Sequence, residues 1–316
     1  MATRRARPPL AAALGALLLA AALPAQHADE DARPDLDLAL REATLVVLAR
    51  PAGTDRAAVV EILAGATGDE VLTLFQPRSY CFHQRFPAEG PVRLLCLVRR
   101  AQGWVPLQRP GLMPVVAPDG AEAEGLRSLC ALIRRMHAHG PREAARDGAA
   151  RINAALAAEL GAWVGRWRTR LPVQAEAALL ALARRPDLAR HLEATGRATL
   201  ASTLEDARSP EGLRDLSARA LVAAADPEVG ARLLALLRDD AAGGLAPVFG
   251  RLLRQVDPEH AAARLAEVFE RGGPKAREAA VTALAATSDP RARAVLKRLA
   301  TRDDLTPTLR HRLRDR

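Results

Sequence analysis

Three segments of the chain share one pattern: DPEVGARLLALLRDD at 226–240, DPEHAAARLAEVFER at 257–271 and DPRARAVLKRLATR at 289–302. Each begins with Asp-Pro, and successive Asp-Pro pairs lie 31 and then 32 residues apart. An Asp at the N-cap accepts hydrogen bonds from backbone N–H groups, and a Pro at the first helical position lacks an N–H that would have no partner. The pattern therefore predicts that helices start at Asp226-Pro227, Asp257-Pro258 and Asp289-Pro290.

The interval between two such starts has room for one helix pair. Apolar residues at helical spacing predict first helices over 227–239, 258–271 and 290–301, second helices over about 245–255 and 274–287, and a short charged helix from 307 to 316. A period near 30 built from two short helices is typical of an α-solenoid. The segments resemble the HEAT-like repeat family, which stacks helix pairs into a scaffold. The resemblance covers residues 171–316.

The first half of the chain has a different character. Apolar residues make up 49% of the 316 residues and aromatic residues only 3%, which favours closely packed short helices for most of the chain. Residues 38–118 are the exception, because short β-rich runs separated by turn residues predict strands there. We expect them near residues 44–48, 57–63, 71–75, 80–86, 92–99, 104–105 and 113–116.

The order of these strands, together with the loop Phe86-Pro87-Ala88-Glu89-Gly90-Pro91-Val92-Arg93-Leu94-Leu95, is similar to netrin/tissue-inhibitor-like domains of exported bacterial proteins. That resemblance implies a small antiparallel OB-like β-barrel. The expected fold class is thus α+β with two domains, the barrel at 38–118 and the HEAT-like solenoid at 171–316, joined by amphipathic helices at 119–170. The N-terminal cysteine that such inhibitors use against a metalloprotease has no counterpart, since no Cys precedes Cys81.

The same loop suggests a disulfide. If residues 87–90 connect a hairpin, Cys81 falls opposite Cys96, and opposed residues of antiparallel strands come within reach of a disulfide. We therefore expect a Cys81–Cys96 bridge, and a buried, unreactive Cys130 on a helix stripe. Trp163 and Trp167, one helical turn apart, are expected to pack at the joint between the two domains.

The N-terminal residues predict export. Residues 1–25 combine three arginines, a 14-residue apolar run and Pro24-Ala25, as a secretory signal peptide does. Residues 26–37 are polar and acidic and predict a linker. The expected location is periplasmic or secreted, and the alternative is a chain anchored by an uncleaved N-terminal segment. Export argues against nucleic acid as a partner.

The excess positive charge is local. Residues 26–289 hold 34 basic and 34 acidic side chains, whereas residues 290–316 hold 9 basic and 3 acidic ones. This C-terminal segment, including Arg310, Arg312 and Arg314, is either a contact for an acidic partner or membrane surface, or a solvated cap on the last repeat.

No catalytic motif is present in the sequence, and we expect no enzyme, cofactor or metal site. His137 and His139 are two residues apart and would not face one way on a helix. The function we expect is a non-enzymatic scaffold that binds a protein partner in a groove lined by the second helix of each pair. Its candidate contacts are Arg232, Arg264, Arg271, Arg293 and Lys297. The alternative is an OB-like domain that docks on or inhibits an extracytoplasmic enzyme, with the solenoid as a spacer.

Overall fold

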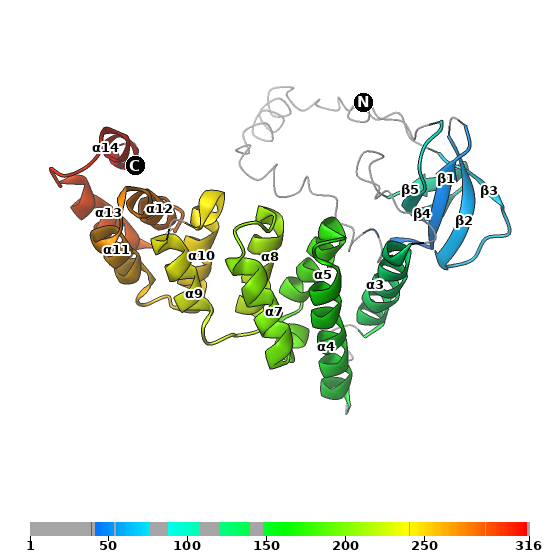
Figure 1. Cartoon of the computed structure of the whole chain (residues 1–316), viewed down its shortest axis with the longest axis horizontal. Helices are drawn as coiled ribbons and strands as arrows, with labels where there is room; N and C mark the ends of the chain where they lie inside the picture. The colour runs from blue at the N-terminus through cyan, green and yellow to red at the C-terminus, as the bar shows by residue number, and fades with distance from the viewer. Residues whose placement is uncertain are drawn as a thin grey trace, which may run out of the picture. The chain divides into compact units, whose positions relative to one another are not determined.

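The structure is a computed structural model that describes residues 39, 42–53, 55–75, 88–107, 120–139, 148–239, 241–287 and 289–314. All of them belong to one compact unit, Leu36–Arg316. The fold is α+β as expected, with a sheet in the first part of the described chain and helices in the rest (Figure 1). Within the described residues, no helix is both long enough and apolar enough to cross a bilayer.

The sheet has five antiparallel strands in the order β3-β2-β1-β4-β5. Their bounds agree with the expected strands: β1 (Leu45–Pro51), β2 (Arg56–Ala64), β3 (Val71–Thr73), β4 (Arg93–Arg100) and β5 (Gly103–Pro106). The strands expected near 80–86 and 113–116 lie outside the described residues.

The expected barrel is not closed. In the part of the chain that the structure describes, the edge strands β3 and β5 are linked by a single bridge between Leu74 and Trp104, in which the Phe75 N–H donates to the Trp104 carbonyl at 2.8 Å. A closed barrel needs a continuous ladder between its first and last strands. The sheet is therefore open, although its two edges meet at one point.

β1 is buried on both faces, which explains its uninterrupted apolar sequence LVVLA. Leu45 and Val47 belong to a small cluster formed by side chains of all five strands. Val46 and Leu48 point to the other face and join the main core, which contains the buried side of α3 (Ala121–Ala138). One face of the sheet is thus covered by a helix.

The helices follow the expected order. They are α3, α4 (Ala149–Trp167), α5 (Pro172–Arg184), α6 (Pro186–Ala189), α7 (Ala194–Glu205), α8 (Glu211–Ala223), α9 (Val229–Arg238), α10 (Ala246–Val256), α11 (Ala261–Arg271), α12 (Pro274–Ala285), α13 (Pro290–Ala300) and α14 (Pro307–Arg314), with a short 3₁₀ turn, η2 (Gly243–Leu245), before α10.

The three Asp-Pro pairs differ in where the helix begins. Only α13 starts as predicted, with Asp289 as its N-cap accepting from the Arg291 N–H at 2.9 Å and Pro290 as its first residue. At the other two pairs a turn comes first, so α9 and α11 begin two and three residues after the proline. Asp226 and Asp257 still accept a backbone N–H from a residue two or three positions on, at 2.9 and 3.2 Å. These carboxylates therefore stabilise the turn before the helix, and the N-caps of α9 and α11 are Glu228 and His260, not the predicted Asp residues.

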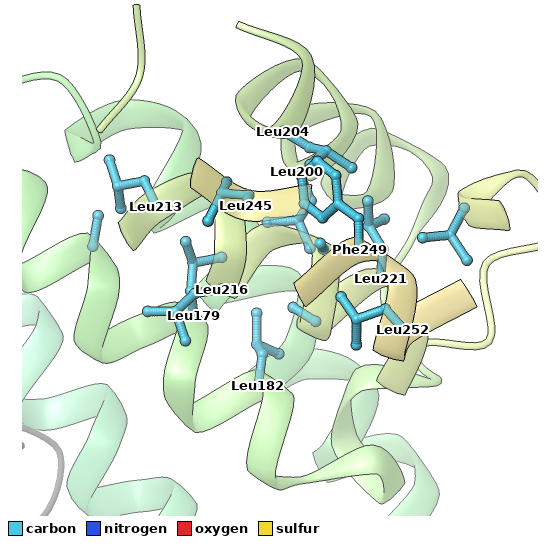
Figure 2. Packing of buried hydrophobic residues seen from close by; sticks show 14 of the residues in the cluster. Leu179, Leu182, Leu200, Leu204, Leu213, Leu216, Leu221, Leu245, Phe249 and Leu252 are labelled. Atoms are coloured by element: carbon cyan, nitrogen blue, oxygen red, sulfur yellow. The ribbon is translucent and has the colours of Figure 1, made fainter. Parts of the chain in front are cut away.

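The helices pack in two rows. First helices contact first helices along α4, α7, α9, α11 and α13, and second helices contact second helices along α5, α8, α10, α12 and α14. Within each pair the two helices also pack together, as α7 does with α8 and α11 with α12. Figure 2 shows leucines of α5, α7 and α8 with Phe249 of α10 in a single apolar cluster. Each pair thus buries its apolar side against its neighbours.

A buried arginine and a glycine join neighbouring helices of this array. Arg214 of α8 is 4% exposed and donates to the carbonyls of Leu204, at 3.0 Å, and Ala241. These bonds supply acceptors for a guanidinium that would be costly to bury alone, and they tie α8 to the chain segments before and after it. At Gly250 of α10, an added Cβ would lie 2.4 Å from the Ala283 carbonyl oxygen of α12. The two second helices therefore approach backbone to backbone.

The joint between α3 and the array has its own contacts. Trp163 and Trp167 of α4 are buried there as expected, and the Trp163 indole N–H donates to the Gly125 carbonyl of α3 at 2.9 Å. Arg185, between α5 and α6, donates to the carbonyls of Met136 and His139 at the end of α3, at 3.2 Å each. These bonds satisfy carbonyls that a helix end otherwise leaves without partners.

Candidate binding surface

The five candidate residues lie on the predicted first helices and not on the second helices, which we expected to line the groove. Arg232 is on α9, Arg264 and Arg271 are on α11, and Arg293 and Lys297 are on α13. All five therefore belong to the first helices of their pairs, whereas the groove was expected to be lined by the second helices. The reason is sequence position: each follows an Asp-Pro pair within the same helix.

Arg232 acts within the array. Its guanidinium forms ion pairs with Glu205 at the end of α7 and with Glu228 one turn earlier, and its side chain is 29% exposed. The hydrogen bond that Arg232 donates to Glu205 is the main cause that raises the pKa of Arg232. Because its guanidinium is already paired with two carboxylates, Arg232 connects one helix pair to the next and is not available to a partner.

The two arginines of α11 are more accessible. Arg264 pairs with Asp257 at 3.2 Å and its side chain is 47% exposed, while Arg271 pairs with Glu267 and is 73% exposed. The Asp257 carboxylate also accepts from His260, and this hydrogen bond is the main cause that lowers the pKa of Asp257. Ion pairs as exposed as these contribute little to stability, so the acidic groups of a partner can replace them.

Arg293 and Lys297 are exposed and form no ion pair with any residue that the structure describes. The same holds for Arg298 on α13 and for Arg251 and Arg254 on α10, which the sequence pattern did not single out. Helical spacing places these groups on the solvent side, but only tertiary structure shows which basic side chains find an acidic neighbour.

The last pairs are joined by a polar network. Arg302, after α13, forms ion pairs with Glu270 of α11 and with Asp304, and Arg277 of α12 also contacts Asp304 at 3.2 Å. The hydrogen bond from Arg302 is the main cause that lowers the pKa of Asp304 to about 2. Part of the C-terminal basic segment is thus used to hold the array together, and Arg310 donates to the carbonyls of Asp303 and Leu305.

Cys96 and Cys130 are buried in the main core between the sheet and α3. Burial is the main cause that raises the pKa of both thiols, that of Cys130 to about 12. Both are therefore protonated at neutral pH and poor nucleophiles. Cys81 lies outside the described residues, so its pairing with Cys96 stays a prediction. Within the sheet, Cys96 has a neighbouring backbone on both sides. One neighbour is β1, and the other is Leu107, whose N–H donates to the Cys96 carbonyl.

The described residues offer charged groups for binding. No three His, Cys, Asp or Glu side chains among them are grouped closely enough to hold a metal ion, and His137 and His139 lie in the last turn and at the C-cap of α3.

No protein-family model matches the chain, and no match to it is found among the curated proteins or the solved structures compared.

Proposed function

We propose that this chain is an exported, non-enzymatic scaffold in which a HEAT-like array of helix pairs binds a protein partner. The observation that carries the proposal is the packing of first helices on first helices and second on second from α4 to α14. Such an array repeats one surface from pair to pair, and repeat proteins use surfaces of this kind for binding. The N-terminal sequence pattern supports the export part of the proposal.

The proposed contact surface lies on the first helices, and α11 offers its best test. Arg264 and Arg271 project from this helix in ion pairs that a partner's acidic groups can replace. Reversing both charges leaves the core untouched because both side chains are largely exposed. We expect R264E/R271E to abolish capture of the partner from an envelope fraction. The melting temperature of this variant should stay within about 2 °C of that of the wild type.

A second candidate function is docking through the sheet. Four of the six large apolar side chains that are exposed in the described residues belong to the sheet or follow it directly: Val60, Ile62, Val71 and Phe75. Exposed apolar side chains that gather in one region often mark an interaction surface. This favours the alternative in which the OB-like part docks on or inhibits an extracytoplasmic enzyme.

The two functions are separated by a matched pair of variants of the full chain. V60S/I62S removes apolar surface from β2, where these side chains are 43% and 42% exposed, and R264E/R271E alters α11. Capture is quantified by mass spectrometry against an unrelated bait. If V60S/I62S loses the captured protein and R264E/R271E keeps it, the array is not the binding part and the scaffold proposal fails.

A further inference from the structure

One face of α13 carries three positive side chains and no acidic one. In the helix sequence PRARAVLKRLA, the residues Ala292, Leu296 and Leu299 are buried against the array. Arg293, Lys297 and Arg298 are exposed, and Lys297 lies one turn after Arg293 on the same side. No described residue forms an ion pair with any of the three.

The acidic residues nearby do not neutralise this face. Asp289 is 8% exposed and caps the N-terminus of α13, where it accepts a backbone N–H at 2.9 Å. Asp304 is held by Arg302 and Arg277. Asp303 is exposed but lies beyond the C-terminal end of the helix. Arg293, Lys297 and Arg298, here called the α13 face, therefore form no ion pair with any of these acidic residues.

Helix stability explains two of these charges but not the third, because Lys297 and Arg298 lie in the last turn of α13, where the helix dipole favours positive groups. Arg293 lies close to the N-terminal end of α13, where the helix dipole disfavours a positive charge. Arg293 and Lys297 are like charges four residues apart, which repel each other along a helix. The arrangement fits a surface that meets an external anionic group.

The composition of the face distinguishes between two kinds of anionic partner. The centre of a protein interface is apolar and rich in aromatic residues and arginine but poor in lysine, so Lys297 distinguishes the α13 face from the arginines proposed to bind a partner on α11. Among the described residues from 289 to 314, no large apolar side chain is exposed. The surface of an anionic bilayer needs no such centre, because each nearby Lys or Arg contributes to the attraction independently. We propose that the α13 face docks the chain on an anionic lipid surface.

The test measures binding of the purified full chain to vesicles by sedimentation. Vesicles of phosphatidylcholine and phosphatidylglycerol in equal amounts are compared with vesicles of phosphatidylcholine alone. Each basic residue near an anionic surface contributes about fivefold to the partition coefficient. We therefore expect R293Q/K297Q to bind the anionic vesicles about 25-fold more weakly than the wild type, and K297Q alone about fivefold more weakly.

The matched control is R251Q/R254Q on α10. It removes the same two charges from exposed side chains that have no described ion-pair partner, so the net charge of both double variants is equal. The proposal expects this control to bind the anionic vesicles within about threefold of the wild type, with all binding weakened by added salt. It is overturned if both double variants lose affinity equally, if neutral vesicles bind as well as anionic ones, or if only an acidic protein binds to the α13 face.

Discussion

Replacing Gly250 by Ala tests whether α10 and α12 really approach backbone to backbone. An added Cβ would lie 2.4 Å from the carbonyl oxygen of Ala283 and 2.7 Å from its carbonyl carbon and Cα, whereas real Cβ atoms essentially never come within 3.0 Å. The obstructing atoms are backbone, so no side-chain rotation relieves the overlap. To bring this distance from 2.4 Å to 3.0 Å, the helices must move apart by at least about 0.6 Å. A gap of about 0.5–1 Å between packed atoms costs a quarter to a half of the dispersion energy of each contact.

The expected size of the effect follows from two opposing contributions. Overpacking a core costs about 1–3 kcal/mol, and the rigid backbone at Ala283 places this site in the upper part of that range. The higher helix propensity of Ala returns about 1 kcal/mol. We expect G250A to lower the free energy of unfolding by roughly 2 kcal/mol, measured by urea unfolding followed by far-ultraviolet circular dichroism.

Gly165 of α4 provides the matched control, because a Cβ there would meet only the Thr199 side chain at 3.5 and 3.6 Å, which is ordinary contact. G165A should therefore stabilise the chain by up to about 1 kcal/mol through helix propensity alone. The two Gly-to-Ala changes are expected to differ in sign. If G250A is as stable as G165A, the close approach of successive second helices is not present in solution.

Two further predictions concern a helix end and a charge network. Ala225, which follows α8, has a φ of 52° in the left-handed region, where an L-residue costs about 1 kcal/mol relative to Gly, so A225G should raise the melting temperature by a few degrees in a thermal scan. The Arg302 hydrogen bond lowers the pKa of Asp304 from an ordinary 3.8 to about 2, so the folded state favours the carboxylate and this stabilisation is present above about pH 4. It should be lost as the pH falls from about 4 to 2, and D304N should show a flatter dependence of melting temperature on pH across that interval; equal slopes for the two proteins would contradict the pairing.

Local signals in the sequence predicted most element positions. The cap at Asp289 and the helix that follows it depend on a few adjacent residues, so the Asp-Pro pattern was sufficient there. The same pattern at Asp226 and Asp257 predicted the N-caps wrongly, because these carboxylates accept an N–H within a turn that precedes the helix, and the N-caps of α9 and α11 are Glu228 and His260. The choice between a turn and a helix start depends on how the next helix packs.

Contacts between distant residues could not be predicted from these signals. Whether the sheet closes depends on pairing between β3 and β5, and only the bridge between Leu74 and Trp104 forms in the described residues. The role of each basic side chain depends likewise on neighbours in another pair. Arg232 and Lys297 both lie off the apolar stripe of a first helix, yet only Arg232 has an acidic partner, Glu205, within reach.

The arginines of the array therefore fall into two groups that mutation can separate. Cohesive contacts join residues about one repeat apart in the chain, as Arg302 does with Glu270 and as the Arg291 side chain does with the Glu259 carbonyl at 3.0 Å. In a stack where each pair contacts only its neighbours, loss of such a contact weakens folding locally. The charges of the α13 face join no pair to another. Their removal should therefore lower the affinity for an anionic surface and leave the melting temperature almost unaltered. Removal of Arg302 should lower the melting temperature and leave the affinity almost unaltered.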